Sequence, residues 1–184
     1  MRLFVGIPLH DTVVRELATV VSRSRSQTDK LRWTEPESWH ITLQFLGHAT
    51  PEQLDCLTLQ LREVRSAPAP LQLGELGFFD RAGIFFVDVA LSPALIALQQ
   101  HVVAATSSCG FVVETRPFHP HITLARAKDQ GRAAQLRELR KKILLQPAFS
   151  RFIAPEFLLY ESHLGAEGSQ YEVLRRFPLA DREP

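Results

Sequence analysis

Apolar and polar residues follow two distinct periods along this chain of 184 residues. Apolar residues recurring every three or four positions are typical of amphipathic helices, and short apolar runs bounded by turn residues are typical of strands. Helices are predicted over residues 11–24, 50–64, 92–108 and 132–144. Strands are predicted over residues 2–7, 31–34, 40–46, 71–76, 77–80, 84–91, 118–127, 152–163 and 171–179. The alternation of helices and strands predicts an α+β protein.

The tetrapeptide His-Ile-Thr-Leu occurs twice, at residues 40–43 and 121–124. Residues two apart in a strand point to the same face, so each copy presents one imidazole and one hydroxyl together. Each motif strand is followed by a helix and then by further strands, and no Pro/Gly/Ser-rich linker separates the two halves. We therefore expect one domain, residues 1–184, with two similar lobes. Each lobe would be an antiparallel sheet with helices on its outer face, and the lobes would enclose a central cleft with one motif strand from each.

Strict alternation extends these two faces along the motif strands. Besides the motif histidines and threonines, it places on the polar face Gln44, Leu46, His119 and Ala125. It places on the opposite, apolar face Ile41, Leu43, Phe45, Ile122 and Leu124. One such strand is more often an ordinary half-exposed strand whose polar side meets water. Two identical copies favour a functional site.

The paired motifs carry the groups that metal-free phosphoryl chemistry requires. An imidazole has a pKa of about 6.5, so near neutrality one histidine can accept a proton while the other donates one. The hydroxyls of Thr42 and Thr123 can donate hydrogen bonds to phosphate oxygens as negative charge builds. No Gly-rich loop of the GxxxxGK[ST] type is present, so the sequence predicts no nucleotide cofactor.

Composition agrees with a globular protein and limits its partners. The chain is 45% hydrophobic and 22% charged, with a net charge of +1, which excludes a general polyanion-binding surface and leaves room for a local basic site. The first apolar run is too short for a signal peptide, and no segment has membrane-spanning length. Cys56 and Cys109 lack CxxC spacing, so free thiols in a reducing compartment are the default, with a disulfide left open. We expect a cytoplasmic monomer that binds no membrane.

Longer stretches around the motifs resemble a known family. These are MRLFVGI at 1–7, LRW at 31–33, WHITLQFLG at 39–47, PFHPHITLAR at 117–126, YESHLG at 160–165 and YEVL at 171–174. They are similar to the paired HxTx signatures of the 2H phosphoesterase superfamily, in its branch of RNA 2′,3′-cyclic phosphodiesterases, also called 2′-5′ RNA ligases. The resemblance covers essentially the whole chain.

The resemblance implies a reaction and roles for the histidines. The reaction is hydrolysis of an RNA 2′,3′-cyclic phosphate to a 2′-phosphate, with ATP-independent 2′-5′ joining as the reverse-type reaction. His40 would be the proton donor and His121 the proton acceptor, although two identical motifs do not order these roles by themselves. The implied substrates are RNA ends such as those of tRNA halves, or small cyclic nucleotides. No metal or cofactor is implied.

Several residues near the motifs are further candidates for substrate contact. Arg126 matches a phosphate-binding arginine of the family, but regular alternation points it away from His121, so either a bulge or the end of the strand must intervene. His119 would touch phosphate or cover an edge. Trp33, Trp39 and Phe118 are candidates for stacking on a base, although aromatic residues beside a motif strand more often belong to the core.

Two other functions compete with this one. In a zinc hydrolase, His119 and His121 would bind the ion together with His40 and Asp88, but no acidic residue lies close to either motif on the same strand face. In a non-catalytic binder of RNA ends or nucleotides, the two histidines would only hold phosphate. Activity that survives a chelator but requires both histidines separates the phosphodiesterase from both rivals.

Overall fold

The computed structural model describes residues 1–26, 30–127, 132–143, 146–165 and 168–180. Its helices are α1 (Asp11–Ser24), α2 (Pro51–Arg62), α3 (Pro93–Ser107) and α4 (Arg132–Lys142), with a 3₁₀ turn at Pro36–Ser38. Its strands are β1 (Arg2–Pro8), β2 (Leu31–Trp33), β3 (His40–His48), β4 (Ala69–Leu71), β5 (Leu73–Phe79), β6 (Ile84–Val89), β7 (His121–Ala127), β8 (Phe152–Ala154), β9 (Glu156–Gly165) and β10 (Gly168–Pro178). The α1 range is the predicted one, whereas Leu144, the predicted end of the last helix, lies outside the described residues.

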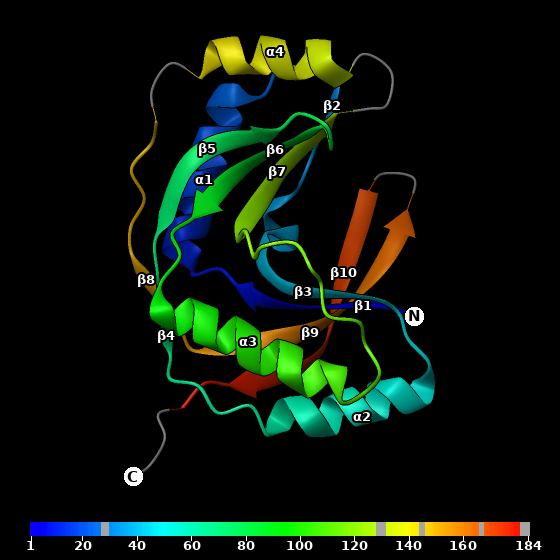
Figure 1. Cartoon of the computed structure of the whole chain (residues 1–184). Coiled ribbons are helices and arrows are strands. Elements are labelled where there is room, and N and C mark those ends of the chain that lie inside the picture. Colours follow the sequence, from blue (N-terminus) through cyan, green and yellow to red (C-terminus); the bar gives the residue numbers. More distant parts are fainter. Residues whose placement is uncertain (27–29, 128–131, 144–145, 166–167, 181–184) are drawn as a thin grey trace.

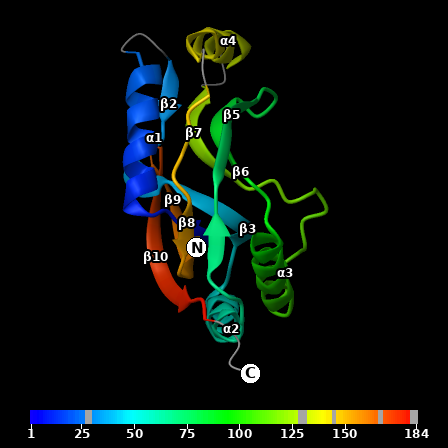
Figure 2. The same ribbon diagram turned by 90° about the vertical axis from the view of Figure 1, so that its left-hand side faces the viewer.

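Two four-stranded antiparallel sheets form the body of the protein (Figures 1 and 2). Their strand orders are β10-β9-β1-β3 and β2-β7-β6-β5. A small third sheet pairs β4 with β8. Helices α2 and α3 pack beside the first sheet, and α4 contacts the second through β7. The α+β architecture with one motif strand in each large sheet is therefore confirmed.

The two sheets are not the two halves of the chain. Strand β2 comes before β3 in the sequence but pairs with β7, and the C-terminal strand β9 pairs with β1 while β10 pairs with β9. The predicted strand over residues 71–76 is divided between β4 and β5, and that over 152–163 between β8 and β9. Because the motif strands β3 and β7 also contact each other, the fold brings the two distant copies of the motif together.

Local sequence signals account for the helix starts. The side chain of Thr50 accepts a hydrogen bond from the backbone of Gln53, whose own side chain accepts one from the backbone of Thr50, and Pro51 occupies the first turn of α2. This capping box satisfies backbone groups that a helix end leaves unpaired. Ser92 caps α3 in a similar way by accepting from Leu95. These helices are therefore set by neighbours in the sequence.

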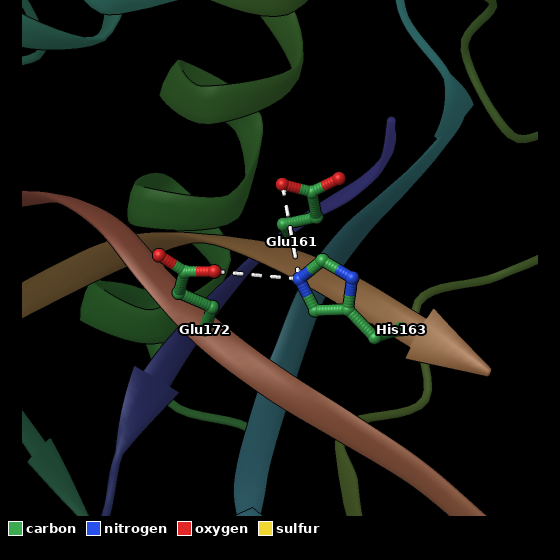
Figure 3. A group of neighbouring side chains, drawn as sticks. All are labelled: Glu161, His163 and Glu172. Atoms are coloured by element: carbon green, nitrogen blue, oxygen red, sulfur yellow. Dashed lines mark ion pairs between the residues drawn. The ribbon is translucent and has the colours of Figure 1, made fainter. Parts of the chain in front are cut away.

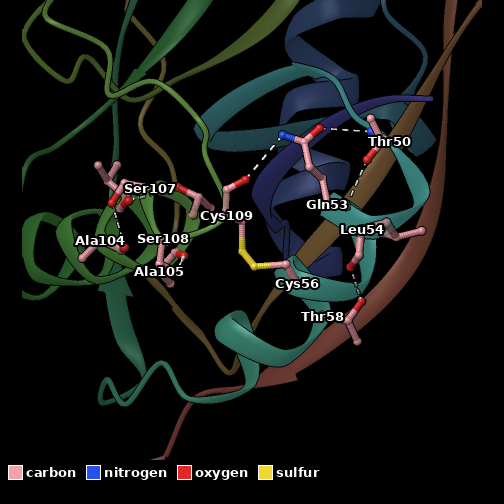
Figure 4. The surroundings of a disulfide bond; sticks show 12 residues. Thr50, Gln53, Leu54, Cys56, Thr58, Ala104, Ala105, Ser107, Ser108 and Cys109 are labelled. Atoms are coloured by element: carbon pink, nitrogen blue, oxygen red, sulfur yellow. Dashed lines mark hydrogen bonds between the residues drawn. A yellow bond between two sulfur atoms is a disulfide. The ribbon is translucent and has the colours of Figure 1, made fainter.

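A disulfide joins Cys56 in α2 to Cys109, just after α3 (Figure 4). Their Cα atoms lie 5.8 Å apart, and the backbone carbonyl of Cys109 also accepts a hydrogen bond from the side chain of Gln53. The prediction of free thiols is wrong. Helices α2 and α3 pack side by side and bring together two residues separated by 53 positions, a contact that cysteine spacing does not show.

No helix in the described part of the chain is long and apolar enough to cross a membrane. The basic helix α4 is a surface helix whose charges have local partners. Arg140 forms an ion pair with Asp80 and lies over the ring of Phe78, and Lys141 pairs with Glu138. These ion pairs are typical of a solvated helix face.

Candidate active site

A bulge in β3 reverses the alternation of its side chains after the motif. Adjacent residues of β1 pair with Thr42 and Gln44, so Leu43 is an extra residue, which is the definition of a β-bulge. Beyond it, Gln44 is buried and Leu46 packs on the core, whereas the side chain of Phe45 is 67% exposed. The prediction that Gln44 and Leu46 share the face of His40 is wrong, and Phe45 takes that place.

The same bulge occurs in β7. Adjacent residues of β6 pair with Thr123 and Ala125, which leaves Leu124 as the extra residue. Ala125 is fully buried and Arg126 is exposed, so Arg126 returns to the face of His121 and Thr123. The bulge that the position of Arg126 required is therefore confirmed, and the prediction that Ala125 lies on the motif face is wrong. We call the polar faces of β3 and β7 the motif faces.

Both motif histidines are oriented by the same hydrogen bond. The Nδ1 atom of each ring lies 2.8 Å from the backbone carbonyl two residues earlier, that of Ser38 for His40 and that of His119 for His121. A carbonyl only accepts a hydrogen bond, so each Nδ1 carries the proton. In the neutral ring, Nε2 can therefore accept a hydrogen bond or take up a proton. In His40, Nε2 lies 3.1 Å from the hydroxyl of Thr42. The two imidazoles thus present the same nitrogen to their surroundings.

Burial and nearby positive charge lower the pKa of both motif histidines. Burial is the largest cause that lowers the pKa of His40 to about 4, and the charges of His121 and Arg126 lower it further, whereas the hydrogen bond that the ring donates to the carbonyl of Ser38 raises it. Burial is also the main reason why the pKa of His121 is lowered, with Arg126 contributing again. The charge of Arg126 therefore acts on both imidazoles, and that of His121 acts on His40. These interactions place all three groups in one electrostatic neighbourhood.

Three aromatic rings pack against His40. Its ring centroid lies 4.6 Å from that of Phe4, 5.7 Å from Tyr160 and 5.0 Å from Tyr171. Burial raises the pKa of Tyr160 to about 12, so its hydroxyl stays protonated at neutral pH. Gly6 makes room for this packing, since a Cβ there would lie 3.0 Å from a backbone oxygen and 3.3 Å from the His40 ring. The three aromatic rings shield one side of the imidazole from water.

Aromatic rings also surround His121. Its ring centroid lies 5.0 Å from that of Phe79 and 5.4 Å from that of Phe86, both edge to face. The Nε2 atom of His119 forms a hydrogen bond of 3.0 Å with a carboxylate oxygen of Asp88. His119 therefore serves the site in one visible way, because its backbone carbonyl orients His121, while its side chain is held beside the motif face by Asp88.

The paired motif strands also place the chain in a known family. The family model described as the 2′-5′ RNA ligase superfamily matches residues 10–163 of the sequence. This chain belongs to the 2′-5′ RNA ligase superfamily. The resemblance seen in the motifs and their flanks is thereby confirmed.

Relatives of the superfamily share the sequence over most of this chain. It is 34% identical over 181 residues to an RNA 2′,3′-cyclic phosphodiesterase of Geobacillus stearothermophilus, a match that covers 96% of this chain and 56% of that protein. The chain thus spans little more than half the length of that relative. It is 27% identical over 184 residues to an RNA 2′,3′-cyclic phosphodiesterase of Bacillus subtilis, with 96% of each chain covered.

Solved structures of the superfamily share the fold. The E. coli protein LigT complexed with 3′-AMP superposes with a TM-score of 0.81 at 25% identity and covers 98% of both chains. The Thermus thermophilus protein TT0787 superposes with a TM-score of 0.81 at 24% identity, with both chains covered completely. The two-sheet architecture is therefore shared with both of these proteins.

The aromatic residues that were predicted to stack on a base are less exposed than Phe45. Trp33 is buried, with its ring edge-on to Phe85, Trp39 is also buried, and Phe118 packs against the core. The core alternative is thus confirmed for both tryptophans. Phe45 was missed because alternation was assumed to be regular. A signal was present, since Phe45 and Arg126 both stand five residues after a motif histidine.

A group of side chains that could hold a metal ion is found outside the two motifs. Among the described residues, the one group of three that could hold an ion is Glu161, His163 and Glu172 on β9 and β10 (Figure 3). There the Nε2 atom of His163 lies 3.9 Å from Glu161 and 3.4 Å from Glu172. His119 and Asp88 instead form a hydrogen-bonded pair. The group of Glu161, His163 and Glu172 thus includes neither motif histidine.

Proposed function

We propose that this member of the 2′-5′ RNA ligase superfamily hydrolyses RNA 2′,3′-cyclic phosphate ends to 2′-phosphomonoesters without a metal ion. The observation that carries the proposal is the matched pair of imidazoles. Each is held through Nδ1 by a carbonyl at 2.8 Å and lies within reach of the charge of Arg126. Relatives named RNA 2′,3′-cyclic phosphodiesterase support the same substrate.

In the proposed reaction, His121 accepts a proton from water as the water oxygen attacks phosphorus. The bond between phosphorus and the 3′ oxygen breaks, and His40 donates a proton to that oxygen, so the 2′ ester remains. The hydroxyls of Thr42 and Thr123 and the guanidinium of Arg126 stabilise the charge that builds on the phosphate oxygens. Joining of a cyclic end to a 5′-hydroxyl would use the same groups without ATP.

The assignment of His40 as donor sets a requirement for the substrate. With a pKa of about 4, the ring carries a proton in only about one free molecule in a thousand at pH 7. An anionic phosphate beside the ring must raise this pKa for His40 to act as an acid. In the free protein His40 is therefore neutral, and its role as donor depends on the bound phosphate.

The stacking face for the terminal base is proposed to be Phe45. Its ring is exposed, and its centroid lies 6.0 Å from that of Phe4, which in turn contacts His40. Stacking of a base on an aromatic ring tolerates different bases, which suits RNA ends of varied sequence such as tRNA halves, as well as small cyclic nucleotides. We further propose that the protein acts as a monomer.

The test is incubation of the purified protein with an RNA oligonucleotide that ends in a 2′,3′-cyclic phosphate, in excess EDTA. Conversion to the 2′-phosphate, lost in both His40→Ala and His121→Ala, is the expected result. Binding without turnover would instead favour a binder of phosphate ends. Activity that appears only with added zinc would favour the metal enzyme.

A further inference from the structure

Two arginines lie side by side on adjacent strands at the edge of the second sheet. Arg32 of β2 pairs directly with Arg126 of β7. Its neighbours Leu31 and Trp33 are buried, whereas Arg32 is exposed. Directly paired residues on adjacent strands point to the same face, so Arg32 lies on the motif face beside Arg126.

This arrangement places two positive charges directly opposite each other on adjacent strands. Like charges directly opposite each other on antiparallel strands are destabilising, and their Cβ atoms are only about 5 Å apart. In the residues that the structure describes, neither Arg32 nor Arg126 has an acidic partner within ion-pair distance. An anion bound between the two guanidinium groups would relieve the repulsion, and a phosphodiester matches their planar donors.

The two arginines do not lie equally close to the motif histidines. The positive charge of Arg126 acts on both His40 and His121, whereas that of Arg32 is not among the charges that act on either. Arg126 is therefore the arginine that would contact the reacting phosphate, and Arg32 adds a second positive charge on the adjacent edge strand β2. The second charge is placed for a neighbouring phosphate of the same RNA strand.

We propose that Arg32, together with Arg126, binds the phosphodiester on the 5′ side of the terminal nucleotide, so that the site prefers an oligonucleotide to a mononucleotide. This inference rests on the proposed function and names the substrate class of that site. It competes with a simpler role. Strand β2 is the edge of its sheet, and a charged residue on an edge strand hinders pairing with other chains. Any charge would serve that role, but only a cation binds phosphate.

The experiment compares two substrates in the wild type and in Arg32→Gln. One is a nucleoside 2′,3′-cyclic phosphate, and the other is a trinucleotide with the same cyclic end. The variant should raise KM for the trinucleotide about tenfold, the loss expected from one charge-assisted hydrogen bond, and leave kcat unchanged. For the mononucleotide, both constants should stay within about twofold. Arg15→Gln, an exposed arginine on α1, is the matched control and should change neither.

Salt and charge variants separate phosphate binding from protection of the edge. The logarithm of KM for the trinucleotide should depend less steeply on the logarithm of salt concentration in Arg32→Gln, by about 0.7 for one lost contact to single-stranded RNA. Arg32→Lys should restore part of the affinity and Arg32→Glu should weaken it further. Equal loss for both substrates would assign Arg32 to the reacting phosphate and overturn the proposal. No loss for either would leave only the edge role and overturn it as well.

Binding measurements keep this test independent of turnover. Fluorescence anisotropy of a labelled trinucleotide ending in a 2′-phosphate measures affinity for the wild type, Arg32→Gln and Arg15→Gln. If the wild type turns over neither substrate, the phosphodiesterase proposal fails, yet a selective loss of binding in Arg32→Gln still supports the arginine pair. Equal binding by all three proteins refutes it.

Discussion

Burial of the His40 ring should make the stability of the free protein depend on pH within a definite window. The pKa of His40 is about 4 in the folded protein, against 6.5 for an ordinary imidazole. As the pH falls below about 6.5, the unfolded chain binds a proton that the folded chain does not. The unfolded state is then favoured, so stability is lost as the pH falls from about 6.5 to about 4, with no further loss from this group below that.

The size of the effect follows from the two pKa values. The full lowering corresponds to about 3 kcal/mol, at about 1.4 kcal/mol for each tenfold change in proton affinity. At pH 5.0 the unfolded imidazole is almost fully charged while the folded one is mostly neutral. About 2 kcal/mol of unfolding free energy should therefore be lost between pH 7.5 and pH 5.0 on account of His40 alone.

Urea unfolding at pH 7.5 and pH 5.0 measures this loss in the wild type and in His40→Gln. Glutamine preserves hydrogen-bonding capacity but does not titrate, and all other titrating groups are common to both proteins. The wild type should lose about 2 kcal/mol more than the variant between the two pH values. His48→Gln, an exposed histidine at the end of β3, controls for substitution itself. Equal losses in the wild type and His40→Gln would refute the claim that burial holds this imidazole neutral.

Four further outcomes are expected. Arg126→Gln should raise the pKa of both motif histidines in an NMR titration, because it removes a positive charge that lowers them; unchanged values would contradict the shared electrostatic neighbourhood. Phe45→Ala should raise KM about tenfold through lost base stacking, with recovery in Phe45→Trp, and an unaltered KM would remove the ring from the site. Thr42→Val should lower kcat about tenfold by losing a hydrogen bond to a charged group, and normal turnover would argue against that role. Reduction of the Cys56–Cys109 bond should lower the free energy of unfolding by about 4 kcal/mol for its loop of 53 residues, whereas Cys56→Ser should not respond to reductant.

The elements of this fold were largely visible in the sequence because their signals are local. The range of α1 follows from helical periodicity, and the start of α2 follows from the Thr50-Pro51 cap with Gln53. The two motif strands were located by their repeated tetrapeptide. Such signals need only the next few residues along the chain.

The pairing of strands was not visible in the sequence, and the errors in the predicted strand faces come from it. Regular alternation placed Gln44 and Ala125 on the motif faces and Phe45 on the apolar face. Each error has the same cause, an extra residue in the motif strand opposite β1 or β6. A bulge belongs to a pair of strands and not to one, so a single strand's sequence does not reveal it. The disulfide was missed for a related reason, since it depends on the packing of α2 against α3.

The sequence by itself determined the chemical groups of this protein and their local order: two imidazoles, each with a threonine two residues later and with either Phe45 or Arg126 five residues later. Tertiary structure alone decided that Phe45 and Arg126 share a face with these histidines and threonines. The matching bulges turn Phe45 and Arg126 toward the motif faces, and the pairing of β2 with β7 sets Arg32 beside Arg126. The physical reason is that side-chain direction in a strand depends on its register with partner strands, and here those partners come from distant parts of the chain.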